Sequence, residues 1–280
     1  MKIMPLQILK SIFQPIASSL AELYFKDYAG LNYIFYRHNN VVASNIETVR
    51  VRLREQWNPP HEVGEHIKNR LIARPPDYDG RSLKLWSFAF DYGTGLLDLE
   101  VSYGKYSQYL FTNLDNKFKR EFPNPKWWFN ALNIGALVLT SDDKIRLHRR
   151  PQSAVQSPGK LDTPCGHPSG MEKVASDNII SAAIAAILKK ELGFEPTIAS
   201  VSPIIAFIAH PCLDFNLMYL VSVKETSKEL DRQNVCFVNA AVDSLSSFLR
   251  ARRRELSRSL PDTLLCFINN KRLKNGDLGR

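Results

Sequence analysis

Apolar residues concentrate in four short stretches between residues 80 and 150, and turn-forming sequences join these stretches in pairs. Residues 83–90 and 97–103 flank the sequence DYGTG, and residues 133–140 and 145–149 flank the sequence SDDK. Short apolar runs bounded by Gly and Asp are typical of β-strands joined by tight turns. The pattern predicts two hairpins, and the first of them forms a sheet ahead of the second.

Helical spacing of apolar residues is present in two further segments. Residues 63–73 lie between two proline pairs, which cannot continue a helix. Residues 242 to about 256 place Leu245, Phe248, Leu249 and Leu256 on one face, with arginines mostly on the other. We therefore expect a short helix in each segment.

The segment 177–192 is helical by its length and its alanine content. Asp177 is positioned to cap its N-terminus, and Gly193 to end it, because glycine readily takes the left-handed conformation that follows a helix. Apolar residues cover nearly the whole circumference, so we expect this helix to be buried on most sides. Strand-like runs follow at 198–208, 215–223 and 235–238.

The composition is that of a globular protein with a sizeable core, since 44% of the 280 residues are hydrophobic and 23% are charged. The formal net charge of +9 favours anionic partners but does not choose among nucleotides, nucleic acid and acidic membranes. The four cysteines lack a CxxC pair, which fits a reducing compartment and predicts free thiols. We expect a cytoplasmic or nuclear protein.

The first 25 residues are apolar and contain no acid before Glu22. Lys10 and two prolines interrupt the run, and no continuous stretch approaches the roughly 20 residues that span a membrane. We expect an N-terminal helix that frays or docks. A mitochondrial-type or secretory leader is the alternative.

One segment carries a recognisable pattern of glycines and acids. Gly166 is followed after five residues by Glu172, and Leu188, Glu191 and Gly193 have the spacing of an aliphatic, an acidic and a glycine position near a helix end. This arrangement resembles the Nudix box, G-x5-E-x7-R-E-U-x-E-E-x-G-U, in which U is aliphatic. The interval between the two halves is six residues longer here.

Features beyond the box extend the resemblance over roughly residues 55–250. The sequence GHP at Gly166, the pair Arg149 and Arg150 after a strand, and the pair Thr112 and Asn113 look like the subfamily of Nudix proteins that hydrolyses UDP-glucose. The resemblance implies an α/β fold, the Nudix α/β/α sandwich with a mixed sheet, at residues 130–240. A β-rich N-terminal region at 56–129 would precede it, after an N-terminal apolar segment and extension at 1–55, and a C-terminal helix and tail would follow at 241–280.

By the same resemblance, the expected reaction is hydrolysis of UDP-sugars, such as UDP-glucose or UDP-galactose, to UMP and a sugar 1-phosphate with Mg²⁺. Such a reaction needs carboxylates that hold the ion and activate water. The implied roles are as follows: Glu191 as catalytic residue and metal ligand, Glu172 as a second metal ligand, Arg149 and Arg150 as phosphate clamps, and Gly166, His167, Tyr106, Thr112, Asn113 and Lys190 as further substrate-binding residues.

The box departs from the family pattern at its acids. Ala186 and Ile187 stand where the family has Arg and Glu, and Lys190 replaces the first acid of the Glu-Glu pair. An ammonium near the ion position repels a cation, so Mg²⁺ would arrive already bound to the diphosphate. We expect hydrolysis weakened by the loss of carboxylates. The alternative is a non-catalytic nucleotide-sugar binding or interaction protein on an eroded Nudix fold.

Plain structural roles are alternatives for each of these residues. The acids and the arginine pair could be solvated surface residues, and the tyrosines between 103 and 109 could pack in a core. The cluster of arginines between 250 and 254 could contact RNA, but it alternates with an apolar face as in any surface helix. We therefore expect neither nucleic acid nor a membrane as the main partner.

Overall fold

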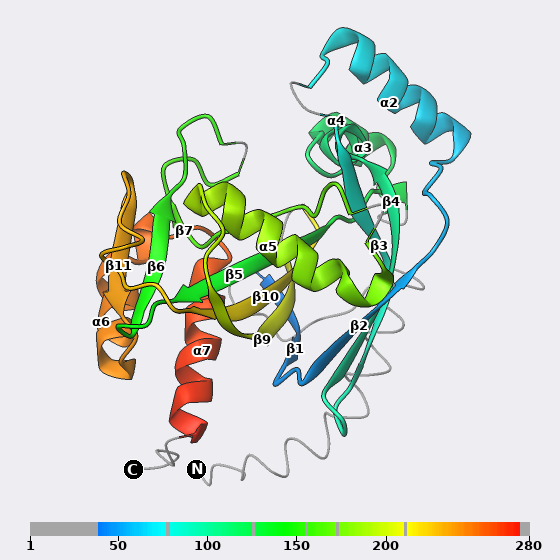
Figure 1. The fold of residues 1–280 in the computed structure, drawn as a ribbon. Coiled ribbons are helices and arrows are strands. Elements are labelled where there is room, and N and C mark those ends of the chain that lie inside the picture. The colour runs from blue at the N-terminus through cyan, green and yellow to red at the C-terminus, as the bar shows by residue number, and fades with distance from the viewer. Residues whose placement is uncertain are drawn as a thin grey trace, which may run out of the picture.

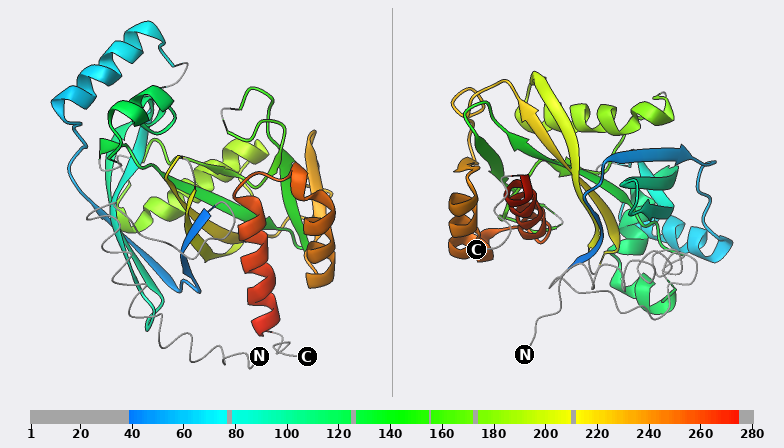
Figure 2. Two further views of the ribbon diagram at one scale, coloured as in Figure 1. Left: turned by 180° about the vertical axis from the view of Figure 1, so that it is seen from behind. Right: turned by 90° about the horizontal axis from the view of Figure 1, so that it is seen from below.

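The computed structural model describes residues 39–76, 79–124, 127–154, 156–171, 174–209 and 212–274. These residues form a mixed α/β fold with two β-sheets, in which helices lie on both sides of the larger sheet (Figures 1 and 2). The strands are β1 Asn39–Ser44, β2 Thr48–Leu53, β3 Arg81–Asp91, β4 Leu96–Lys105, β5 Leu132–Leu139, β6 Lys144–Arg149, β7 Leu161–Asp162, β8 Cys165–Gly166, β9 Ile198–Ala209, β10 Asp214–Val223 and β11 Val235–Asn239. The α-helices are α2 His61–Ala73, α3 Tyr106–Asn113, α4 Asn116–Glu121, α5 Ile179–Leu192, α6 Val242–Arg252 and α7 Leu260–Lys274, and the 3₁₀ turns are η2 Ser176–Asn178 and η3 Arg253–Glu255.

The larger sheet has the strand order β1, β9, β10, β5, β6, β11, with the short strands β7 and β8 beside β6 and β5. β5 runs parallel to β10, whereas the other pairs in this sheet are antiparallel. β5 and β10 lie next to each other at the centre, and most of their residues are buried on both faces of the sheet. Their nearly continuous apolar sequences follow from this position.

Successive residues of β5 point to opposite faces, and each face has its own core. Ile134 and Val138 join Ile184 and Leu188 of α5 in one apolar core. Leu137 packs on the other side with α6 and α7. Figure 2 shows α5 on one side of the strands and α6 and α7 on the other. The expected α/β/α sandwich with a mixed sheet is confirmed.

A smaller sheet of β2, β4 and β3 packs against the α5 side of the sandwich. β3 and β4 form the predicted first hairpin, and Leu83 and Leu99 of these strands belong to the same core as α5. The β-rich N-terminal extension is therefore confirmed, although β1 crosses over to pair with β9 of the larger sheet. The domain boundaries expected after residues 55, 129 and 240 stay a prediction.

Two expectations for α5 were wrong. The helix begins after Asn178, and Asp177 lies in the preceding 3₁₀ turn. One face of the helix is exposed, because Ala185, Ala186, Lys189 and Lys190 are turned away from the sheet. Small alanines fit either side of a helix, so the apolar pattern did not identify this open face.

Three helices, α3, α4 and α7, were not predicted. The aromatic stretch 106–113 forms α3. The C-terminal residues expected as a tail form α7, which buries Leu264, Phe267 and Ile268 under the larger sheet. The N-terminal segment and its leader alternative fall in residues 1–38, outside the described residues. Within the described part of the chain, no helix is long and apolar enough to cross a membrane.

Gly193 ends α5 as predicted, and its left-handed backbone (φ 79°) lets its N–H donate to the carbonyl of Lys189. A side chain here would meet no neighbour, so only the backbone conformation requires glycine. We expect Gly193→Ala to lower the free energy of unfolding by about 1 kcal/mol. Urea unfolding measures this change. Gly166→Ala is the control, since Gly166 has open space and no positive φ, and an equal loss in both variants would contradict the argument.

Candidate functional site

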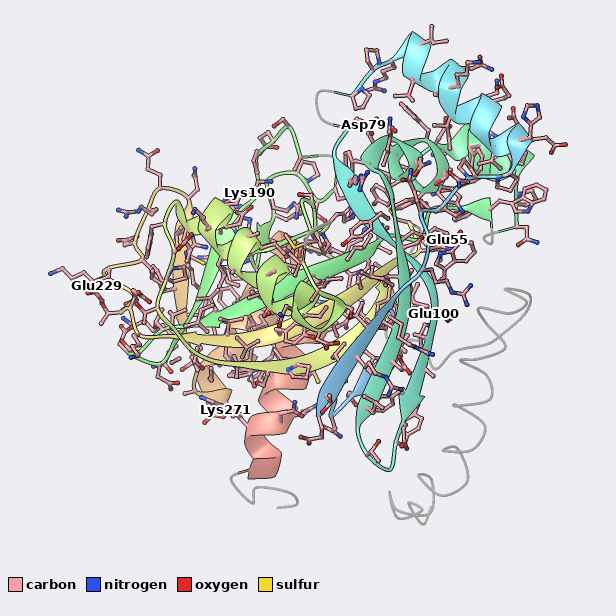
Figure 3. All side chains as sticks on the ribbon, turned by 45° about the vertical axis from the view of Figure 1, so that its right-hand side comes forward. Glu55, Asp79, Glu100, Lys190, Glu229 and Lys271 are labelled. Carbon is pink, nitrogen blue, oxygen red and sulfur yellow. The ribbon has the colours of Figure 1, made fainter. Side chains whose placement is uncertain are left out.

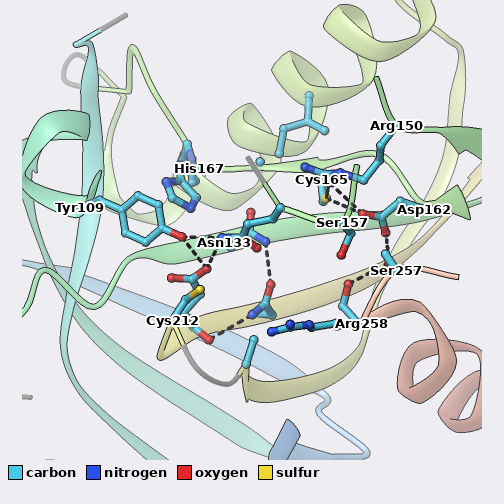
Figure 4. A pocket seen from close by; sticks show the side chains of 18 of the residues that line it. Tyr109, Asn133, Arg150, Ser157, Asp162, Cys165, His167, Cys212, Ser257 and Arg258 are labelled. Carbon is cyan, nitrogen blue, oxygen red and sulfur yellow. Dashed lines mark hydrogen bonds and ion pairs between the residues drawn. The ribbon is translucent and has the colours of Figure 1, made fainter. Parts of the chain in front are cut away.

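A cleft of about 1150 Å³ opens between the C-terminal half of α5, the loop after β8, and α3 (Figure 4). The loop after β6 and the segment before α7 complete its walls. Its charged lining consists of five basic and three acidic side chains: Lys119, Arg150, Lys160, Lys190, Arg258, Asp162, Glu191 and Asp214. The basic excess favours an anionic ligand.

Asp162 organises one end of this cleft. Its carboxylate is deeply buried and accepts hydrogen bonds from Arg150 Nη1 (2.8 Å), Ser257 Oγ (2.7 Å) and the backbone N–H of Thr163 (2.9 Å). Figure 4 shows Arg150, Asp162, Cys165 and Ser257 grouped at this end. Burial raises the pKa of the Cys165 thiol, so this thiol is neutral. The hydrogen bond to Asp162 holds the guanidinium of Arg150 at the cleft wall.

Glu191 lies at the C-terminus of α5 and lines the same cleft. Its Oε2 atom is 3.6 Å from Nε2 of His148 on β6. Burial lowers the pKa of His148 below its ordinary value, so this imidazole is neutral at neutral pH. Arg146, two residues earlier on β6, donates from Nη2 to the Glu191 carbonyl at 3.4 Å. These contacts fix the end of the helix that presents Glu191.

The opposite end of the cleft is polar. The Tyr109 hydroxyl donates to Asp214 Oδ2 at 2.9 Å, and Gln156 Nε2 donates to the same oxygen at 3.1 Å. The ring of His167 packs edge-on against Tyr109, with centroids 4.5 Å apart. Figure 4 shows Tyr109 and His167 side by side at this end, away from Arg150.

Burial shifts both titratable groups at the polar end towards their neutral forms. It raises the pKa of Asp214 to about 6 and lowers the pKa of His167 to about 4. Burial also raises the pKa of Tyr106, and the nearby Asp214 raises it further. His167 is therefore neutral at this end, and the charge of Asp214 is lost as the pH falls through about 6.

The structure brings most of the predicted site residues to the cleft. Lys190 stands on the exposed side of α5 (Figure 3). The predicted residues that line the cleft are Tyr106, Arg150, Gly166, His167, Lys190 and Glu191. Glu172 lies outside the described residues.

Three predicted residues do not line the cleft. Arg149 turns outward, where it donates to the Gly159 carbonyl and to Glu255. Thr112 and Asn113 are fully buried, and both accept from the backbone N–H of Phe129. Their hydrogen bonds hold α3 in place and leave them unable to contact a base.

Sequence reasoning missed His148, Gln156, Asp162 and Asp214. For some of them a signal was present. Arg146, His148 and Arg150 alternate along β6 and just beyond it, so a period of two places them on one face and Arg149 on the other. Asp214 likewise alternates with Asn216 in an otherwise apolar strand. Gln156 belongs to an irregular loop, and no sequence spacing links it to Asp214.

The described residues do not form a resident Mg²⁺ site. Mg²⁺ prefers carboxylate oxygens in octahedral geometry. The described part of the chain contains no group of three or more His, Cys, Asp or Glu side chains able to hold a metal ion. The oxygens of Asp162 are already engaged by Arg150 and Ser257, and Asp214 belongs to the polar end. Glu191 alone is a poor match for the ion.

A scan of family profiles finds no match to this chain, and no curated protein matches it. Among solved structures, the MutT protein from Methanosarcina mazei Go1 is similar over 50% of this chain and 94% of its own, at 17% identity and a TM-score of 0.32. A Nudix hydrolase from Nitrosomonas europaea is similar over 50% of this chain and 88% of its own, at 15% identity and a TM-score of 0.33. The Nudix domain of Shewanella oneidensis NrtR, complexed with ADP ribose, is similar over 44% of this chain and 86% of its own, at 15% identity and a TM-score of 0.31. Similarities this low assign neither a family nor an activity to this chain.

The raised pKa of Asp214 makes a prediction about stability and pH. The folded protein holds the Asp214 proton up to about pH 6, whereas the ordinary value in the unfolded chain is 3.8. The stability that this proton contributes is therefore full below pH 3.8 and is lost as pH rises through about 6. Asp214→Asn keeps an acceptor for Tyr109 and Gln156 without a charge. We expect the variant to gain stability relative to the parent as pH rises.

Urea unfolding of both proteins between pH 4 and 7 measures this difference, with the pH window set by the pKa of about 6. His167 titrates in the same window with the opposite sign, because burial lowers its pKa to about 4. Its contribution is present in both proteins and cancels in the difference. A stability difference that does not change with pH would contradict the prediction.

Proposed function

We propose that this chain is a Nudix-type hydrolase whose cleft binds a nucleotide diphosphate derivative, with UDP-sugars as the substrate class. The reaction is the attack of water on one phosphorus of the diphosphate, which yields UMP and a sugar 1-phosphate. The observation that carries this proposal is the convergence of five basic side chains on one cleft that also contains the carboxylate of Glu191.

The size and the charge of the cleft support a ligand of this kind. Its volume of about 1150 Å³ leaves room for a base, two sugars and a diphosphate arranged along it. Guanidinium and ammonium groups meet phosphate oxygens with charge-assisted hydrogen bonds. Arg150 and Lys190 come from different elements, so together they can hold a diphosphate from two directions.

Glu191 is the residue that we assign to proton transfer. Its carboxylate would accept a proton from the attacking water as the new P–O bond forms, while the bridging P–O bond breaks towards the departing phosphate. The imidazole of His148, 3.6 Å away, is neutral, and the nearby Arg146 donates its hydrogen bond to the Glu191 backbone carbonyl and not to the carboxylate. Glu191 can therefore act as a base.

Mg²⁺ enters this proposal as part of the substrate. A nucleotide diphosphate carries Mg²⁺ on its own phosphate oxygens. The chain's contribution is to bind the phosphates, orient water and take up the proton. If the ligand binds without release of UMP at any Mg²⁺ concentration, the protein is a nucleotide-sugar binding protein, the alternative that the loss of box acids favours.

Adjacent lysines test the binding part of the proposal. Lys190 lines the cleft, whereas Lys189 forms an exposed ion pair with Glu195. We expect Lys190→Ala to weaken UDP-glucose binding about tenfold, because one charge-assisted hydrogen bond to phosphate is lost. Lys189→Ala should leave the affinity unchanged. Calorimetry on both variants decides, and equal effects would remove Lys190 from the site.

A matched pair of acids tests the chemical step. We expect Glu191→Gln to lower the rate of UMP release from UDP-glucose about a hundredfold or more, because the amide cannot accept the proton. Glu195→Gln, an exposed acid outside the cleft, is the control. The rates are measured over a range of Mg²⁺ concentrations. Turnover in Glu191→Gln equal to that of the parent would exclude Glu191 as the base.

A further inference from the structure

Asp214 at the start of β10 has one oxygen that no group among the described residues satisfies. The residue is only 3% exposed, and its Oδ2 atom accepts hydrogen bonds from Tyr109 and Gln156. Its Oδ1 atom is buried and has no hydrogen-bond partner within the ranges that the structure describes. A buried acceptor without a donor is destabilising, so this arrangement is costly unless a ligand supplies the donor.

The surroundings of this oxygen belong to the cleft. Asp214, Tyr109, Gln156 and His167 all line it. His167 Nδ1 is likewise buried without a hydrogen-bond partner in the described part of the chain. Asp214 and His167 both contact Tyr109, so their two unpaired atoms, Asp214 Oδ1 and His167 Nδ1, lie at the same end of one cavity.

The unpaired oxygen at this end needs a hydrogen-bond donor, which an ionised phosphate cannot supply. Lys119 acts on Asp214 electrostatically, but the hydrogen bonds that Asp214 Oδ2 accepts come from Tyr109 and Gln156. Burial holds His167 in its neutral form, with a pKa of about 4. A phosphate would place acceptor oxygens against the Asp214 carboxylate, whereas Arg150 and Lys190 provide donors for phosphate elsewhere in the cleft. The ligand group at this end must be neutral and must donate hydrogen bonds.

Further polar groups continue the pattern. Asn216 Nδ2 donates to the Asp214 carbonyl at 3.0 Å, and Asn133 Nδ2 donates to Asn216 Oδ1 at 2.6 Å. The rings of Tyr106 and Tyr109 pack against each other and line the same cleft as these amides. A carboxylate, amides and aromatic faces suit a ring that carries hydroxyl groups, because each hydroxyl both donates and accepts while the ring carbons pack on aromatic faces.

We infer that Asp214, Tyr109, Gln156 and His167 form a subsite for the hydroxyl groups of a sugar ring, in which a hydroxyl donates to Asp214 Oδ1. This inference rests on the proposed function, since the same ligand would extend its phosphates towards Arg150 and Lys190. The hydroxyls belong either to the ribose of the nucleotide or to the hexose of the nucleotide sugar. Both sources share the chemistry that the subsite recognises.

Calorimetry with UDP-glucose, UDP and 2′,3′-dideoxy-UDP tests the subsite in the parent protein and in Asp214→Asn. Ca²⁺ replaces Mg²⁺ in the buffer, so that Mg²⁺-dependent turnover stops while the diphosphate keeps a divalent ion. If the subsite holds the hexose, the variant binds UDP-glucose about tenfold more weakly and binds UDP as the parent does. If it holds the ribose, the variant binds UDP-glucose and UDP more weakly, and 2′,3′-dideoxy-UDP is affected much less.

Other results overturn the inference. Unchanged binding of all three ligands, or an equal loss for all three including 2′,3′-dideoxy-UDP, shows that Asp214 does not recognise a sugar hydroxyl. Absence of binding in the parent protein overturns the proposed function as well, so the two failures are distinguishable.

Gln156→Ala provides a second variant in case Asp214→Asn does not fold. Gln156 lies on the half-exposed loop after β6 and contributes one of the two donors to Asp214 Oδ2. Its removal loosens the carboxylate without removing it. We expect the same order of effects across the three ligands, with a smaller loss of about threefold. A uniform loss across the ligands contradicts the inference here too.

Discussion

The buried carboxylate of Asp162 is the contact on which the cleft depends. It joins the end of β6 through Arg150, the strand β7 to which it belongs, and the segment before α7 through Ser257. Backbone pairing already joins β7 to the end of β6 and to the segment before α7, and the Asp162 side chain adds a polar contact to both. Loss of Asp162 would leave the Arg150 guanidinium without its carboxylate partner and the wall at Ser257 without its anchor. The cleft is thus held together by a buried polar contact as well as by its apolar floor.

Because Asp162 holds Arg150 at one end, the two ends of the cleft differ in their chemistry. Arg150 is fixed at one end, and Tyr109 and Gln156 fix Asp214 at the other. Burial weakens the charge of Asp214 and His167, whereas the end near Arg150 and Lys190 keeps its cations. A ligand with one anionic and one hydroxylated part can satisfy both ends at once. A simple phosphate or a simple sugar can satisfy only one.

The sequence predicted the elements that periodicity and turn residues define. The hairpins, the helix ending at Gly193 and the strands β9 to β11 follow directly from apolar spacing. The cleft was only partly predictable because its contacts join distant segments, as in the pairing of Gln156 with Asp214. The sequence could have identified Arg150, and not Arg149, as the cleft residue, because alternation along β6 places Arg150 on the same face as His148 and Arg149 on the other. Thr112 and Asn113 looked like ligand-binding residues, but polar side chains are equally able to satisfy buried backbone groups.

The two lysines at the end of α5 have a structural consequence as well as a chemical one. The C-terminus of a helix carries partial negative charge, which favours lysine and disfavours glutamate. Lys189 and Lys190 therefore stabilise the last turn, whereas the Glu191 carboxylate opposes the helix dipole and is offset by the guanidinium of Arg146 nearby. A cluster of carboxylates at this position needs a metal ion to offset its own repulsion. With lysine at 190, α5 ends stably without one, and the phosphate charge of a ligand can be met by side chains that are already in place.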